Sequence, residues 1–191
     1  MSGRYPTPAQ ARRLLREAET QNPGAWAQHS RVAAYCAERI AAAVGMNPAK
    51  AYVLGLLHDV GRKFGQGHLA HVYDGYRYMM ELGYEAVARI CLTHSFSTPD
   101  LDTYIGNRDI PETHQAQLRG LLEGITYDDY DRLVQLCDCM ARAKGVVSME
   151  ERMTDVKRRY GSYPQEKWDA NMALKDYFSE KSGRDVYEIV K

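Results

Sequence analysis

The chain has 191 residues, 45% of them hydrophobic, and its 25 lysines and arginines balance its 25 aspartates and glutamates. This length and apolar fraction predict one domain over residues 1–191 with one sizeable core. The zero net charge excludes a global positive field of the kind that holds a nucleic-acid polymer or an anionic membrane. Since the longest apolar run is far shorter than a membrane span and the first residues lack a signal-peptide core, we expect a cytoplasmic protein without a membrane partner.

Cysteine usage predicts a reducing environment. The sequence contains no C-x-x-C pair, and the C-x-C pair formed by Cys137 and Cys139 is a poor zinc signature. These two residues, with Cys36 and Cys91, are expected to be buried free thiols, because a chain of this size and hydrophobicity does not need a disulfide scaffold.

Helix signals dominate the chain. An asparagine-proline pair at 22–23 is typical of a helix start, and Gly45 is typical of its end. A second pair at 47–48 repeats the start signal, and the glycines that follow His58 end that helix. Apolar spacing predicts the further helices His68–Leu82, Tyr84–His94, Thr113–Glu123, Tyr127–Lys144, Met149–Tyr160 and Gln165–Ser179. Because alternating strand patterns are essentially missing, we predict an all-α helical bundle.

The segment 97–131 is strongly acidic, with eight acidic residues against two arginines, and it contains the longest predicted loop. It has two interpretations, a lid over a site or an ordinary solvated excursion of the chain. The sequence favours the solvated one.

Five polar residues fall on the apolar faces of four predicted helices. At three-to-four spacing, the apolar stripe of the 22–45 helix extends back onto His29, and the stripe of the Tyr84–His94 helix leads to His94. Asp138 lies among apolar neighbours in the Tyr127–Lys144 helix. The pair His58 and Asp59 directly follows an apolar run at a helix end, where burial costs several kcal/mol, on the order of the charged-group penalties, unless a partner offsets it.

Each of these residues also has a simple structural explanation. An inward histidine commonly bonds a backbone carbonyl, and Asp138 could pair with Arg142. The whole set could also form a buried hydrogen-bond network without metal. A metal ion explains the residues together, because imidazole and carboxylate are ligands of divalent cations and a helical bundle can direct them inward from several helices.

The arrangement resembles the HD superfamily of metal-dependent phosphohydrolases. The motif of that family is a histidine on one helix, a His-Asp pair ending a later helix, and an aspartate further on, which His29, His58 with Asp59, and Asp138 match in order. Members with two metals add two histidines, which are matched by His71 with Gly75 four residues later, and by His94. The resemblance covers about residues 24–145, implies an HD-domain helical bundle, and leaves about 146–191 as a helical C-terminal extension.

The resemblance implies a ligand set and a reaction. One metal would be held by His29, His58, Asp59 and Asp138, with Asp59 as a bridge to a second metal held by His71 and His94. The expected cofactors are one or two divalent ions, Mn, Fe, Co, Ni, Zn or Mg, which polarise a phosphoryl oxygen and yield hydroxide that attacks a phosphate ester or anhydride. Beside the catalytic Asp59, Arg62 and then Lys63 are the expected phosphate clamps, with solvated charges at a helix end as the alternative.

The expected substrate is a small soluble phosphate compound, a nucleotide by resemblance, with dinucleoside polyphosphates among the candidates. A neutral chain with a small helical site favours such a compound over a nucleic-acid polymer. Tyr104 could stack on a base. The alternative function is a non-catalytic regulatory module that binds metal and nucleotide.

Overall fold

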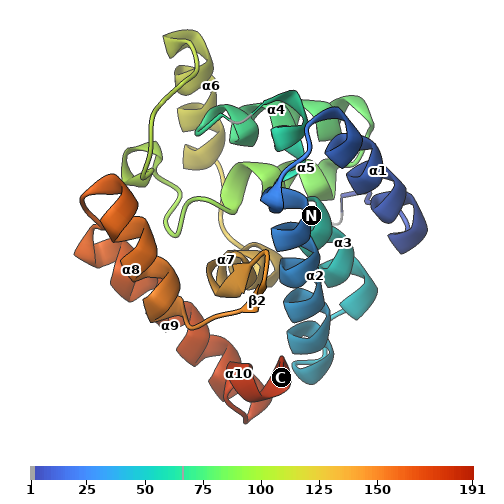
Figure 1. The fold of residues 1–191 in the computed structure, drawn as a ribbon, viewed down its shortest axis with the longest axis vertical. Helices are drawn as coiled ribbons and strands as arrows, with labels where there is room; N and C mark the ends of the chain where they lie inside the picture. Colours follow the sequence, from blue (N-terminus) through green and yellow to red (C-terminus); the bar gives the residue numbers. More distant parts are fainter. Residues whose placement is uncertain (1–2, 66) are drawn as a thin grey trace.

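The computed structural model describes residues 3–65 and 67–191 as a helical bundle (Figure 1). Its elements in chain order are α1 Pro8–Gln21, α2 Ala25–Ala43, α3 Pro48–Leu57, the 3-10 helix η1 Val60–Phe64, α4 Ala70–Glu81, α5 Glu85–Thr93, the 3-10 helix η2 Leu101–Thr103, α6 Glu112–Glu123, α7 Asp129–Met140, β1 Ala141–Arg142, β2 Gly145–Val146, α8 Met149–Tyr160, α9 Gln165–Ser182 and α10 Val186–Ile189. Within these described ranges the strands form a single antiparallel pair, which joins Ala141 to Val146 and Arg142 to Gly145. The predicted all-α class is confirmed.

The helix starts at the N-terminal end agree with the sequence only in part. Asn47 caps α3 as predicted, and its side chain accepts a hydrogen bond from the Lys50 amide at 3.1 Å. The predicted cap of α2 is wrong, because Gly24 is the N-cap and Asn22 instead follows α1 as its C-cap. The sequence patterns did not predict α1, which begins with a capping box at Thr7 and buries a narrow apolar face in an otherwise polar helix.

α7 ends at Met140, before the predicted end at Lys144. Ala141 has an extended backbone, with φ −95° and ψ 138°, and opens the hairpin. Its carbonyl oxygen accepts a hydrogen bond from Nδ1 of His29 at 3.1 Å. Inside a helix this carbonyl would bond the amide one turn later. A tertiary contact therefore ends the helix where local propensity would continue it.

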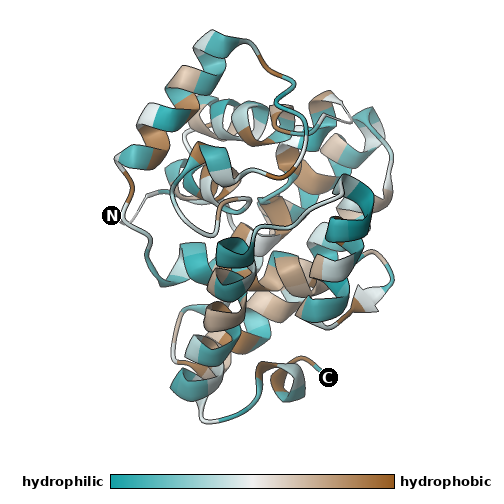
Figure 2. Cartoon of the chain, turned by 90° about the vertical axis from the view of Figure 1, so that its left-hand side faces the viewer, coloured by the Kyte–Doolittle hydropathy of each residue, from teal (hydrophilic) through white to brown (hydrophobic). Residues whose placement is uncertain are grey.

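α7 lies in the middle of the molecule, where it packs against α2, α3, α5, α8 and α9 (Figure 1). Leu133, Val134 and Leu136 of this helix are fully buried. α8 and α9 lie on one side of α7, and α1 and α3 lie on the other (Figure 1). Hydrophilic and hydrophobic residues are interspersed along most of the helices (Figure 2), and these helices present an apolar face to their neighbours. None of the helices in the described ranges combines the length and the apolarity needed to cross a bilayer.

All four cysteines are free thiols, as expected. Cys36, Cys91 and Cys137 are buried, and Cys139 is partly buried. Desolvation raises the pKa of the Cys36 thiol to about 12, so this group stays protonated and packs as a small apolar side chain.

The acidic segment 97–131 departs from the solvated excursion that the sequence favours. Leu101 is 1% exposed, and Tyr104 lines a cavity of about 620 Å³. Asp102 of η2 accepts hydrogen bonds from Arg108 and from Arg119 of α6, so η2 is tied to α6. Four of the eight acidic residues are thus ion-paired with described residues, namely Asp100, Asp102, Asp129 and Asp131, and the first part of the segment forms part of a cavity wall.

Candidate metal centre

The structure brings the six predicted ligands together from five parts of the chain. His29 lies on α2, His71 on α4 and Asp138 on α7. The remaining ligands follow helix ends, where His58 is the C-cap of α3 with Asp59 next to it and His94 is the C-cap of α5. They form two groups of three that could each hold a metal ion, namely His29, His58 and Asp138, and Asp59, His71 and His94.

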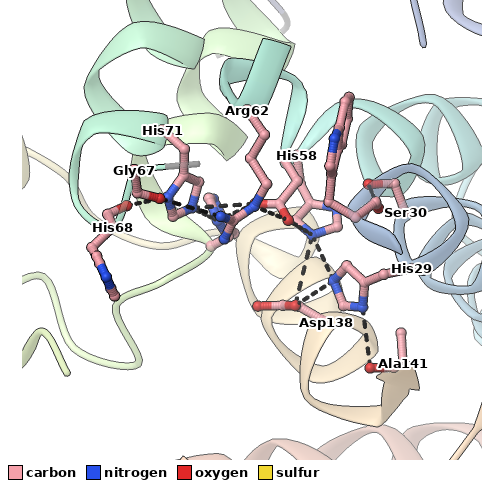
Figure 3. Close-up of polar contacts among 12 residues, drawn as sticks. His29, Ser30, His58, Arg62, Gly67, His68, His71, Asp138 and Ala141 are labelled. Carbon is pink, nitrogen blue, oxygen red and sulfur yellow. Dashed lines mark hydrogen bonds and ion pairs between the residues drawn. The ribbon is translucent and has the colours of Figure 1, made fainter. Parts of the chain in front are cut away.

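The first group is centred on one carboxylate oxygen (Figure 3). Oδ1 of Asp138 lies 2.9 Å from Nε2 of His29 and 3.7 Å from Nε2 of His58. The two Nε2 atoms are 3.2 Å apart. Three potential ligand atoms thus converge from three helices.

The second group has the same form. Oδ1 of Asp59 lies 3.2 Å from Nε2 of His71 and 3.5 Å from Nε2 of His94, and these nitrogens are 3.1 Å apart. The other oxygen of Asp59 lies 4.0 Å from Nε2 of His58, so this carboxylate faces both groups. The rings of His58 and His94 are 5.0 Å apart between centroids. The structure thus places Asp59 with the second group, and its bridging role remains a prediction.

Backbone carbonyls orient all four imidazoles. The Nδ1–H of His29 donates to the Ala141 carbonyl, and that of His58 donates to the Gly55 carbonyl at 2.7 Å. The Nδ1–H of His71 donates to the His68 carbonyl, and that of His94 donates to the Cys91 carbonyl at 3.0 Å. Because a carbonyl can only accept, each Nδ1 carries a proton, and in the neutral ring each Nε2 then presents a lone pair to the centre. This is the tautomer that a metal-ligating histidine needs.

This geometry favours a metal site over a hydrogen-bond network of neutral imidazoles. In neutral rings, the Nε2 lone pairs of His29 and His58 face each other at 3.2 Å, and those of His71 and His94 at 3.1 Å. A hydrogen bond within either pair would require an imidazolium, whereas a divalent cation accepts both lone pairs and the carboxylate oxygen together. The residues therefore fit a metal ion in each group.

Ionisation of the carboxylates fits the same conclusion. Burial disfavours the charged form of Asp59, but the Arg62 guanidinium, helped by contacts with the neighbouring histidines, outweighs burial and holds the pKa of Asp59 well below the usual value. Burial of Asp138 is likewise outweighed by its contacts with His29 and His58, which lower its pKa. Burial and the nearby Arg62 lower the pKa of His71 to about 3, so its ring is neutral at pH 7.

Two glycines allow the second group to form. A Cβ on Gly61 would lie 2.0 Å from the carbonyl oxygen of His71 and 2.5 Å from the amide nitrogen of Gly75. A Cβ on Gly75 would lie 3.3 Å from the amide nitrogen of Gly61 and 3.1 Å from Cβ of Cys91. The absence of both side chains lets η1 approach α4 closely, which places Asp59 beside His71.

The residues expected to hold phosphate lie in different places. Arg62 donates from Nε to Asp59 at 2.7 Å and from one terminal nitrogen to the Gly67 carbonyl at 3.3 Å, and it lines the cavity (Figure 3). Lys63 does not line the cavity. Its ammonium instead lies 3.9 Å from the ring centroid of Tyr78. Of the two residues, only Arg62 lies at the predicted site.

Asp138 does not pair with Arg142, the simple partner considered from the sequence. Arg142 lies 3.6 Å from Glu151 and 3.5 Å from Asp155 instead. Asp138 is left to the two histidines of its group.

The centre opens into a cavity of about 620 Å³. Five of the six potential ligands line it, and residues of α8 and α9 form another part of its wall, Arg152 and Lys167 among them. The sequence analysis did not predict this wall, because nothing in the spacing of the 149–179 helices indicates which face meets a site. The one available signal was the presence of basic residues on both helices.

Comparison with known proteins agrees with the geometry. The family model described as HD domain matches residues 26–143, more than half of the chain, and this range includes all six potential ligands. No curated protein and no solved structure gave a match. The chain therefore belongs to the HD domain family, whose members are generally metal-dependent hydrolases.

Proposed function

We propose that this chain is a divalent-metal-dependent phosphohydrolase that cleaves a phosphate ester or anhydride bond in a small soluble compound, a nucleotide. The observation that carries the proposal is the convergence of four histidine Nε2 atoms and two ionised carboxylates, from six residues of which five line one cavity. Divalent ions held there would polarise a phosphoryl oxygen and lower the pKa of a bound water to about 7.

The chain's own residues prepare the site for that reaction. Backbone carbonyls hold the histidine rings in one tautomer, so the ligand atoms need no reorganisation. Arg62 is bound to Asp59 through Nε, which leaves its other terminal nitrogen, without a partner among residues 3–65 and 67–191, for a phosphoryl oxygen. Its role is to orient the phosphoryl group and to balance charge that develops on it.

The cavity supports a small substrate. Its volume of about 620 Å³ falls in the range of small-molecule pockets. Trp26, Tyr104 and Tyr163 contribute aromatic surface to the lining, which is suited to the flat base of a nucleotide. The net charge of zero gives no support to a polymeric nucleic-acid substrate.

Elemental analysis and a hydrolysis screen test the proposal together. We expect close to two divalent ions per chain, lower content in Asp138→Asn and His94→Ala, and release of phosphate from nucleotides with Mn, Fe, Co or Mg. Asp129→Asn is the matched control, because it is on the same helix as Asp138 but pairs with Lys181 outside the cavity. No metal after purification or reconstitution would overturn the proposal. Metal without hydrolysis of any phosphate compound would instead favour the non-catalytic regulatory module.

A further inference from the structure

The cavity contains more positive charge than its own ion pairs neutralise. Its lining has six basic and three acidic residues, and two of the acids belong to the metal groups. Arg62, Arg142 and Arg159 are each paired with a carboxylate. The other three, which form no ion pair with any residue of the described ranges, are Lys144, Arg152 and Lys167. In a chain with zero net charge, this local excess indicates an anionic ligand.

All three unpaired cations lie after residue 143, where the match to the HD domain family ends. Arg152 is on α8 and Lys167 on α9, two helices that line the same cavity as the metal centre. The family match therefore accounts for the metal ligands, and the C-terminal segment supplies the unpaired charge.

Lys167 has the most defined position. Its ammonium donates to the Ser95 carbonyl at 2.8 Å and to the Thr103 carbonyl at 3.2 Å. An ammonium has three N–H donors, so one remains for a ligand. Burial lowers its pKa to about 8, because the nearby Asp138 offsets only part of the desolvation. Asp138 is itself engaged by His29 and His58. A bound anion would supply the missing counter-charge.

Arg152 and Arg142 extend this wall. Arg152 is partly buried, and its side chain forms no hydrogen bond or ion pair with any described residue, so the guanidinium is free to bind an oxyanion. Nε of Arg142 is buried without a hydrogen-bond partner, although the rest of this guanidinium faces Glu151 and Asp155. An unsatisfied buried donor on this wall is a second observation that points to an acceptor ligand.

We propose that Lys167 and Arg152 form a second anion subsite, which binds a phosphoryl group adjacent to the one that reacts at the metal centre. The substrate is then a compound with two or more linked phosphoryl groups, a nucleoside diphosphate or a longer phosphoanhydride, and not a monophosphate ester. This inference rests on the proposed function, because it assigns the non-reacting end of the same substrate. The C-terminal segment thereby determines substrate class.

Binding of two non-hydrolysable probes to the metal-loaded protein tests the subsite without catalysis. Methylenediphosphonate offers two linked phosphoryl groups and methylphosphonate offers one. Metal chelation alone favours the diphosphonate, so the deciding comparison is between variants. We expect Lys167→Met and Arg152→Met each to weaken diphosphonate binding about tenfold and methylphosphonate binding less than about twofold. The matched control is Lys175→Met on the same helix, because Lys175 pairs with Asp185 away from the cavity.

A purely structural role for Lys167 predicts a different result. Lys167→Gln can still donate to Ser95 and Thr103 but carries no charge, so it weakens diphosphonate binding if the subsite exists and preserves it if the lysine only ties the loop. The Arg152 side chain forms no bond to a loop carbonyl. If the Lys167 variants do not fold, diphosphonate binding by Arg152→Met still tests the subsite. Unchanged diphosphonate affinity in the variants, or equal loss for both probes, overturns the subsite.

Two further outcomes distinguish failure of the subsite from failure of the proposed function. If diphosphonate binding depends on Lys167 and Arg152 while no phosphate compound is hydrolysed, the subsite stands and the hydrolase falls. If monophosphates are hydrolysed as well as diphosphates, and equally by the variants, the hydrolase stands and the subsite falls.

Discussion

Replacement of Gly61 by alanine tests how the metal centre is assembled. The new Cβ would lie 2.0 Å from the His71 carbonyl oxygen and 2.5 Å from the Gly75 amide nitrogen. Since Cβ contacts shorter than 3.0 Å are essentially never seen, η1 and α4 would have to separate by at least about 1 Å. Both opposing atoms belong to the backbone, so no change of rotamer relieves the contact.

The magnitude follows from this displacement. Overpacking of a rigid interior costs about 1–3 kcal/mol, and separation of Asp59 from His71 adds the loss of a buried contact. We therefore expect the free energy of unfolding of Gly61→Ala to fall by about 3 kcal/mol or more. A site holds its geometry only within about 0.5 Å, so the metal content should fall as well.

Denaturant unfolding and elemental analysis measure the two effects. Gly120→Ala is the matched control, because a Cβ there meets no atom within 4 Å in the middle of α6. This control should raise the free energy of unfolding by about 0.5–1 kcal/mol, since alanine is the better helix former. A Gly61→Ala protein with parental stability and metal content would refute the assigned role of this glycine.

Removal of metal by a chelator should lower the melting temperature by on the order of 10 °C, because ions bound only by the folded chain stabilise it; an unchanged melting temperature in calorimetry would argue for the metal-free network. Asp131→Asn should lower the free energy of unfolding by about 3 kcal/mol in urea titrations, because this fully buried carboxylate accepts from Arg89 and Thr93; a change below about 0.5 kcal/mol would contradict that assignment. For Lys167, burial lowers the pKa in the folded state to about 8, from 10.5 in the unfolded chain. Because the unfolded chain then binds more protons between these pH values, the parent should gain stability relative to Lys167→Met as pH rises from about 8 to 10.5. A pH-independent difference in denaturant titrations would count against the lowered pKa.

The sequence predicts those features that depend on local spacing. Asn47 before a proline starts α3 because its side chain caps the first turn. His29 and Asp138 could be placed inward because helical periodicity assigns each residue to a face before any contact is known. The order of the six ligands then identified the family that the match to residues 26–143 shows.

What the sequence could not predict depends on contacts between distant segments. The early end of α7 follows from the bond between His29 and the Ala141 carbonyl, which joins residues far apart in the chain. Arg62 and Lys63 are neighbours with the same charge, yet one meets Asp59 and the other meets Tyr78. Lys167 belongs to the site because α9 packs against α7, and no pattern within α9 carries that information.

The backbone acceptors behind the four imidazoles make the centre tolerant of mutation in an unusual way. An aspartate or a glutamine that orients a ligating histidine can be lost by one nucleotide change, whereas a carbonyl oxygen persists whichever side chain its residue carries. Three of these acceptors lie one turn or less before their histidine, in Gly55, His68 and Cys91. The orientation of these three histidine rings therefore depends on the local turn remaining folded. Metal affinity should accordingly vary with how often those turns open, a quantity that amide hydrogen exchange near His58, His71 and His94 reports directly.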